Sequence, residues 1–360
     1  MFSKRTSVGL DVHARSVVAC GIDTVTGELI RSRLTLQHAE VLEWIGRLPS
    51  PVAVAYEAGP TGFGLARTLR AAGVRCEVLA PSKLQRPAGE RVKTDARDAL
   101  HLARLLRLDE FTGVRVPGVA QEAARDLVRA REDVRGDLMR ARHRVSKLLL
   151  RQGIIYDGGS TWTGPHHGWL AAQRFESAAV QGAYDAAYET VVMAEDRRAR
   201  LDAAIAALAR DPAWHPVVAR LGCLRGIDTL TALGLAVEIG DWQRFTGSSI
   251  GAYLGLVPSE SSSGASRSQG PITKTGNTHA RRLLVEAAWH HQPRYRPGVS
   301  LRRRWDQATP AARARGHAGN QRLHQRWLAF TAHHKRPVVA DVAIARELAG
   351  WCWSPATLPD

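Results

Sequence analysis

The chain has 360 residues, a hydrophobic fraction of 44% and a formal net charge of +16. This length exceeds that of one small module and predicts two or three domains, each large enough to bury a core. The composition excludes a disordered or fibrous protein. Most basic residues are Arg, whose planar guanidinium suits phosphate oxygens. We therefore expect a polyanionic partner, although an Arg-rich coding bias alone would also raise the pI.

The cysteines and the apolar runs indicate in which cellular compartment the protein is expected. Cys20, Cys76, Cys223 and Cys352 lie far apart and form no CxxC pair, so we expect neither a zinc ribbon nor a disulfide framework. The N-terminus lacks an apolar run of signal-peptide length, and no segment approaches the roughly 20 apolar residues of a membrane span. These patterns predict a cytoplasmic protein, associated with the nucleoid if its partner is DNA, and no membrane partner.

The first part of the chain alternates short strands and helices. Apolar residues alternate along 6–35, with a turn at Thr26-Gly27, which predicts strands. Thr94 directly precedes an amphipathic pattern, as the N-cap of a helix does. The predicted order is strands within 6–35, helix 39–48, strand 51–56, helix 61–72, strand 74–79 and helix 94–108. This order is found in RNase H-like domains and predicts an α/β domain over residues 1–115.

The second predicted domain, residues 116–212, is a helical, coiled-coil-like spacer. An Arg-rich helix is expected from 119 to 151 and a second helix from 173 to 210. Apolar residues recur at heptad spacing in the first of them: Leu127, Val134, Ala141 and Leu148. The two helices form either a pair within one chain or the seam of a dimer, and the sequence leaves both open.

The third predicted domain, residues 213–360, is mainly helical and ends in a helix at 337–351. Within it, the segment 221–245 has the pattern of a helix-hairpin-helix, a motif that binds backbone phosphate at a helix N-terminus. Asp228 places a negative charge in the turn of this motif. We therefore expect the segment to have a packing role.

Four carboxylates fall where predicted elements meet. Asp11 lies in a strand, Glu57 ends an apolar strand, and Asp95 and Asp98 are three residues apart on one helix face. Taken singly, each could be an ordinary acid paired with a neighbouring base or a helix end. Together they offer the oxygen ligands that Mg²⁺ prefers, and two ions about 4 Å apart stabilise both reacting oxygens of a phosphodiester. The set predicts a catalytic site for Mg²⁺, with Mn²⁺ as the alternative.

A second candidate site is the segment 256–290, in which three consecutive serines precede Gly264. A hydroxyl on a glycine-flanked turn approaches a phosphorus atom closely. Farther along, Lys274, Arg281 and Arg282 are candidate nucleic-acid-binding residues that would counter charge on the transition state. On composition alone, a flexible Ser/Gly linker is the better interpretation.

Several segments resemble the DEDD transposases of the IS110 family of insertion sequences. They are SVGLDVH, AYEAGPTGFGLARTL and KTDARDALHLARLL in the first domain, and SSSGASRSQGPITKTGNTHARRLL in the third. The resemblance implies a RuvC-like first domain whose metal ligands are the four acids. It also implies an essential serine before a glycine in the C-terminal transposase domain. That serine is Ser263 here, with Ser262 as its nearest rival. The PGIG-like turn of the family is replaced by Arg225-Gly226-Ile227-Asp228.

The resemblance implies a transposase or recombinase that cuts, exchanges and rejoins DNA strands, guided by a structured bridge RNA that the element encodes. Sequence choice then rests on base pairing, and the Arg-rich surfaces bind backbones. The implied partners are double-stranded DNA of donor and target sites, the guide RNA, and further copies of the chain in a homodimer or homotetramer. A serine alone is a weak nucleophile, so we expect the metal on the acids to activate it.

Two other functions are compatible with the sequence. A metal-dependent RuvC-like nuclease of the Holliday-junction resolvase type would use the four acids without needing Ser263. A non-catalytic nucleic-acid-binding protein with a decayed RNase H-like fold would need neither, and the intact set of acids argues against it. A covalent adduct between Ser263 and DNA separates the transposase from the resolvase.

Overall fold

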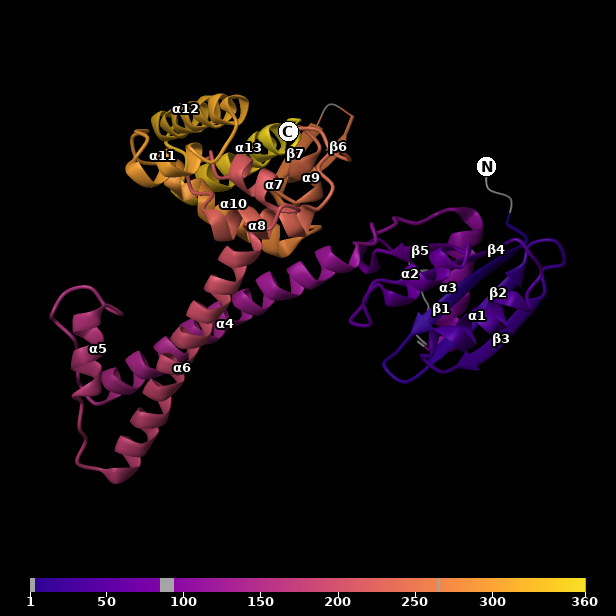
Figure 1. Cartoon of the computed structure of the whole chain (residues 1–360), viewed down its shortest axis with the longest axis horizontal. Helices are drawn as coiled ribbons and strands as arrows, with labels where there is room; N and C mark the ends of the chain where they lie inside the picture. The colour runs from indigo at the N-terminus through magenta and orange to yellow at the C-terminus, as the bar shows by residue number, and fades with distance from the viewer. Residues whose placement is uncertain (1–3, 85–93, 265, 360) are drawn as a thin grey trace. The chain divides into compact units, whose positions relative to one another are not determined.

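The computed structural model describes residues 4–84, 94–264 and 266–359 (Figure 1). The chain divides into two compact units, Met1–Gly118 and Val119–Asp360. The sequence-based boundary at 115 lies close to this division. Residues from both ends of the expected spacer share a buried core with the C-terminal helices. The boundary at 212 stays a prediction.

The N-terminal unit is built on a five-stranded sheet with the strand order β3-β2-β1-β4-β5. The first three strands form an antiparallel meander, and the last two run parallel to β1. The strands are β1 (Thr6–Val12), β2 (Val17–Asp23), β3 (Leu29–Leu34), β4 (Val52–Glu57) and β5 (Arg75–Leu79). The predicted α/β domain and the order of its elements are confirmed.

Helices cover both faces of this sheet. On one face, Leu10 and Tyr56 belong to the same buried cluster as residues of α1 (His38–Gly46) and α2 (Gly64–Ala71). On the other face lies α3 (Asp95–Leu108), which packs against β1, β2 and β4. A short 3₁₀ turn, Pro81–Lys83, follows β5. The central strands are therefore buried on both faces, which accounts for the apolar run 52–56 of β4.

Gly9 allows α3 to approach β1 very closely. A Cβ atom at this position would lie 2.0 Å from the carbonyl oxygen of Ala99 and 2.5 Å from the amide nitrogen of Ala103. Both are backbone atoms of α3, which cannot move aside as a flexible side chain can. The missing side chain of Gly9 thus sets the distance between helix and strand.

The C-terminal unit begins with a pair of long antiparallel helices, α4 (Val119–Arg151) and α6 (Ala178–Leu208) (Figure 1). Three of the four heptad residues of α4 are buried, so the apolar stripe faces a helix of the same chain. The intramolecular pair, one of the two alternatives, is therefore present. A short helix that the sequence did not predict, α5 (Gly164–Ala171), packs on this pair through Leu170.

The rest of this unit is mostly helical, as predicted, but it also contains a two-stranded hairpin, β6 (Pro258–Ser263) and β7 (Ser266–Ile272). Its other elements are α7 (His215–Leu221), α8 (Thr229–Ile239), α9 (Ile250–Tyr253), α10 (Thr278–Ala288), a 3₁₀ turn (Trp289–His291), α11 (Val299–Trp305), α12 (Pro310–Ala332) and α13 (Pro337–Ala356). None of the helices among the described residues combines the length and apolar character needed to cross a membrane.

The turn between α7 and α8 is used for packing and capping. Gly226 has φ +81°, and a Cβ there would lie 2.4 Å from the carbonyl oxygen of Ala287 in α10. Asp228 is the N-cap of α8, and its side chain accepts a hydrogen bond from the amide of Thr231 at 2.8 Å. These contacts agree with the packing role expected for this turn.

We predict that Gly9→Ala destabilises the N-terminal unit by about 1–3 kcal/mol or more, because the added methyl group would overlap the backbone of α3. Urea unfolding of the full chain measures the change. Gly46→Ala is the matched control, since Gly46 ends α1 and a Cβ there would have no atom within 4 Å. Equal stability of the two variants would contradict the close approach of α3.

Candidate active site

Asp11, the last residue but one of β1, and Glu57, the last residue of β4, lie at the carboxyl ends of neighbouring parallel strands. Leu10 of β1 pairs in register with Tyr56 of β4, so the next residue of each strand lies at the same carboxyl edge of the sheet. Side chains alternate along a strand. Because Gly9 contacts α3 and Ala55 belongs to the cluster beneath α3, both acids lie on the face that α3 covers.

The first turn of α3 brings two more acids to this edge. Thr94 is the N-cap of the helix, as predicted, and its hydroxyl accepts a hydrogen bond from the amide of Arg97 at 3.4 Å. Asp95 and Asp98 follow in the first turn. Burial raises the pKa of Asp11 above its ordinary value, and the charges of Asp95 and Asp98 raise it further, while His13 opposes them. Both acids of the helix therefore act electrostatically on the carboxyl group of Asp11.

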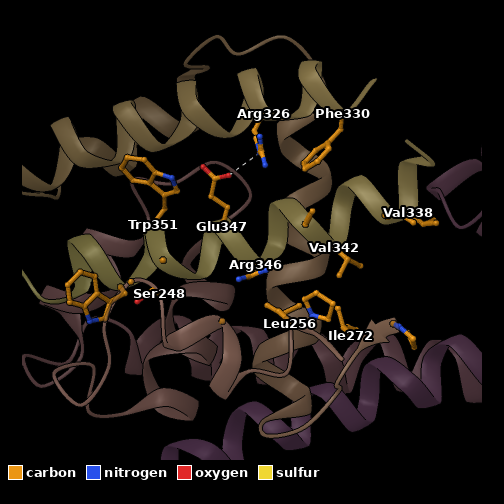
Figure 2. A pocket seen from close by; sticks show the side chains of 18 of the residues that line it. Ser248, Leu256, Ile272, Arg326, Phe330, Val338, Val342, Arg346, Glu347 and Trp351 are labelled. Carbon is orange, nitrogen blue, oxygen red and sulfur yellow. Dashed lines mark ion pairs between the residues drawn. The ribbon is translucent and has the colours of Figure 1, made fainter. Parts of the chain in front are cut away.

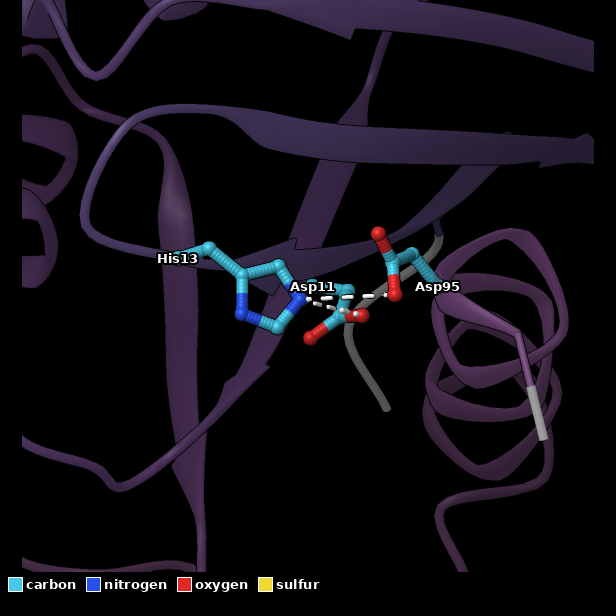
Figure 3. A group of neighbouring side chains, drawn as sticks. All are labelled: Asp11, His13 and Asp95. Atoms are coloured by element: carbon cyan, nitrogen blue, oxygen red, sulfur yellow. Dashed lines mark hydrogen bonds and ion pairs between the residues drawn. The ribbon is translucent and has the colours of Figure 1, made fainter.

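The imidazole of His13 faces acids from two elements (Figure 3). Its Nε2 atom is 3.1 Å from Oδ2 of Asp11 and 3.6 Å from Oδ1 of Asp95. One potential ligand atom from each of these three residues lies within 4.8 Å of the others. Glu57 and Asp98 lie outside this group. Two carboxylates and an imidazole form a donor set that fits a divalent metal ion.

His13 was missed by the sequence analysis, although a signal for it was present. It stands two residues after Asp11, just beyond the end of β1, and residues two apart on an extended chain project to the same side. The acid that completes its environment, Asp95, comes from α3, far along the chain, and no local pattern connects the two.

The serine-rich segment forms an ordered hairpin where composition alone favoured a linker. Ser263 ends β6 and pairs with Ser266 of β7, and Gly264 takes φ +56° in the turn between them. The hydroxyl of Ser262 donates to Oε1 of Glu260 at 2.8 Å. Ser263 is exposed, and its hydroxyl has no hydrogen bond within the described part of the chain. The hairpin therefore presents Ser263 at its tip.

The three basic residues named from sequence have different environments. Arg281 donates to the backbone carbonyls of Leu254 and Thr275 at 3.0 and 2.8 Å, which holds the loop before α10 in place. Arg282 forms ion pairs with two glutamates. Lys274 is exposed on the loop that follows β7. Of the three, Lys274 has the side chain most accessible to a nucleic acid.

A buried carboxylate, Glu238 of α8, anchors the start of α10. Its exposed fraction is 0%, and Arg129 of α4 donates two hydrogen bonds to it at 2.8 and 2.9 Å. Asn277 donates to it at 2.6 Å, and Nδ1 of His279 lies 3.0 Å from it. The side chain of Asn277 also accepts from the amide of Ala280 and so caps α10. Glu238 therefore joins α4, α8 and the loop after the serine hairpin.

A groove of about 960 Å³ lies beside the base of the same hairpin (Figure 2). Ile272 of β7 and Val342 of α13 contribute to its mostly hydrocarbon lining. Arg326 and Glu347 form an ion pair of 3.7 Å at its rim. A groove with a mostly hydrocarbon lining suits packing better than phosphodiester chemistry. The hairpin tip and the acids are therefore the better candidates for the chemical sites.

The chain is similar to known transposases over most of its length. Residues 8–153 match the DEDD transposase family of IS110 elements, and residues 218–303 match the family described as transposase IS116/IS110/IS902. A Sinorhizobium fredii protein named as a transposase is 41% identical over 310 residues, covering 85% of this chain and 75% of that protein. The transposase for insertion sequence element IS1533 of Leptospira borgpetersenii is 31% identical, covering 80% and 86% respectively.

We predict that Glu238→Gln destabilises the chain by about 3 kcal/mol at pH 7, because it removes the charge that Arg129 binds at a buried site. Burial alone would raise the pKa of Glu238, but hydrogen bonds from His279, Arg129 and Asn277 outweigh it and hold the pKa well below 4.5. This stabilisation is therefore present above pH 4.5 and is lost as the pH falls below it.

Urea unfolding of the wild type and of Glu238→Gln between pH 7 and pH 3 measures this effect. The difference between their free energies of unfolding should become smaller as the pH falls. Glu286→Gln is the control, since Glu286 is 58% exposed in its ion pair with Arg282 and should contribute little at any pH. A difference that stays constant down to pH 3 would show that the buried charge is not the cause.

We also predict that Mg²⁺ or Mn²⁺ raises the melting temperature of the chain, since a ligand that binds only the folded state stabilises it by about 2.7 kcal/mol at 100 times its Kd. Asp95→Asn should remove most of this stabilisation, because it takes a charge from the group around His13. Glu28→Gln, which changes an exposed acid of the same unit, should leave it intact. Thermal unfolding with and without the ion distinguishes these results.

Proposed function

Because this chain belongs to the IS110 family of transposases, it is a DNA transposase, and we propose that two groups carry its chemistry. One is the set of acids in the N-terminal unit, and the other is Ser263 at the tip of the serine hairpin. The observation that carries this proposal is the gathering of Asp11, His13 and Asp95 within 4.8 Å in a chain of this family.

The N-terminal unit is proposed to have an RNase H-like, RuvC-like fold. Its strand order, β3-β2-β1-β4-β5, with an antiparallel meander followed by two parallel strands, supports this assignment. So does the place of the acids at the carboxyl ends of β1 and β4, where parallel strands of open α/β sheets commonly present functional side chains.

The proposed metal ligands are Asp11, Glu57, Asp95 and Asp98, and the proposed ion is Mg²⁺ or Mn²⁺. When bound, such an ion supplies a Lewis acid that stabilises negative charge on phosphodiester oxygens. The chain contributes the positions of the ligands. β1 and β4 hold two acids at adjacent strand ends, and the capped first turn of α3 presents the other two.

Ser263 is the proposed nucleophile. Its oxygen would attack the DNA phosphorus and form a phosphoserine ester while the deoxyribose oxygen leaves with a proton. A hydroxyl of the exchanging strand would then attack the ester and release the serine. The exposed position of Ser263 next to Gly264 supports this role, whereas the hydroxyl of Ser262 is bound to Glu260.

The proposed partners are DNA of the donor and target sites, a structured guide RNA, and further copies of the chain in a dimer or tetramer. The net charge of +16 supports binding to nucleic-acid backbones. The exposed Arg302 and Arg303 of α11 and the exposed Lys274 are candidates for these contacts. We expect the protein to act at the nucleoid, where its DNA sites are.

We predict that Ser263→Ala lowers strand exchange by about 10³-fold or more and abolishes a covalent protein–DNA adduct, since removal of a nucleophile typically has effects of this size. Adducts are detected by denaturing electrophoresis of the full chain with labelled DNA carrying the ends of its element, in Mg²⁺. Ser262→Ala is the matched control and should retain both products.

Two results would contradict this assignment. An adduct lost in Ser262→Ala but kept in Ser263→Ala would move the nucleophile by one residue. Full cleavage by Ser263→Ala, together with loss of cleavage in Asp11→Asn, would favour the alternative of a metal-dependent nuclease of the resolvase type. That alternative shares the acids and needs no serine.

A further inference from the structure

The position of His13 is set by the turn between β1 and β2. Its amide donates to the carbonyl oxygen of Ser16 at 2.9 Å, which closes the turn. The side chain is 51% exposed, yet Nε2 points to acids on two elements, Asp11 of β1 and Asp95 of α3 (Figure 3). The backbone around His13 therefore directs its imidazole to the place where the acids meet.

The distances within this group match those between the ligands of one ion. Octahedral ligands with bonds of about 2.1 Å lie about 3 Å apart when they are neighbours and about 4.2 Å apart when they are opposite. Nε2 of His13 lies 3.1 Å from one acid and 3.6 Å from the other. The whole group spans 4.8 Å at most. The three atoms therefore need only small movements to contact one ion.

The chemistry of the donors decides which ion fits. Mg²⁺ is held mainly by oxygen and binds imidazole weakly. First-row transition ions such as Mn²⁺ bind carboxylates and also accept imidazole nitrogen. A site made only of Asp11, Glu57, Asp95 and Asp98 would have oxygen ligands alone. The imidazole of His13 changes this donor set.

We propose that His13 is a direct ligand of the divalent ion in the N-terminal unit and gives this site a preference for Mn²⁺ over Mg²⁺. The inference rests on the proposed metal site. It adds His13 to the ligands of that site and assigns the site a metal selectivity. Other positions of the site remain assigned to carboxylates. His13 binds the ion through Nε2, the atom that already faces the acids.

Pulsed electron paramagnetic resonance of Mn²⁺ bound to the full chain tests the assignment without any measurement of activity. The wild-type protein should show the hyperfine coupling of a directly bound ¹⁴N nucleus, and His13→Gln should lose it. His38→Gln is the matched control, because His38 belongs to the same unit and bonds to Thr68. This control should keep the nitrogen coupling.

Calorimetric titration of the full chain with each ion measures the selectivity for Mn²⁺ over Mg²⁺. His13→Gln should raise the Kd for Mn²⁺ by about tenfold or more while changing the Kd for Mg²⁺ by less than about threefold. Equal weakening for both ions, with the nitrogen coupling still present in the variant, would overturn the role of His13. Circular dichroism of His13→Gln should match that of the wild type, so that misfolding is not the cause.

The outcomes for His13 and for the proposed metal site are separable. In one outcome, Asp11→Asn abolishes Mn²⁺ binding, but the bound Mn²⁺ of the wild type shows no nitrogen coupling. This result would overturn the role of His13 and leave the carboxylate site in place. Failure of Mn²⁺ to bind, or binding that Asp11→Asn leaves unchanged, would overturn the metal site itself and the inference with it.

Discussion

The close contact between α3 and β1 is the constraint on which the N-terminal site depends. Gly9 has no side chain, so the backbone of α3 at Ala99 lies directly on the strand. This contact brings the first turn of the helix to the ends of β1 and β4, where the acids are. Burial is the main cause of the raised pKa of Asp11, and repulsion by the charges of Asp95 and Asp98 raises this pKa further. Binding of a cation would relieve that repulsion.

The C-terminal unit is stabilised by different means. Ser263 is exposed at a hairpin tip. The buried charge of Glu238, with the arginine and the asparagine that bind it, holds the loop that follows the hairpin and the start of α10. Such a network stabilises the unit only while its carboxylate stays ionised and fully paired. Backbone contact thus organises the acids of the N-terminal unit, and a buried ion pair organises the start of α10 in the C-terminal unit.

Much of the fold was predictable from local pattern, since alternation and helical periodicity follow from which residues each element buries. The hairpin was not, because β6 and β7 are almost wholly exposed and so lack the apolar alternation of a half-buried strand. The glycines and histidines of residues 153–168 favour a loop, yet Gly164–Ala171 forms α5, since Leu170 is buried against the long helices. Packing outweighed local propensity there.

The sequence by itself determined the class of the protein, the four candidate acids and the serine before Gly264, because these lie in contiguous motifs whose residue types limit the chemistry. Only the tertiary structure decided how they are grouped. It brought Asp95 close to Asp11 through the packing of α3 on Gly9 and placed His13 within 4 Å of both acids. It also placed Glu238 against the loop after the hairpin. The contacts of Asp95 with His13, of α3 with Gly9 and of Asn277 with Glu238 join residues far apart along the chain. Local periodicity carries no information about such contacts.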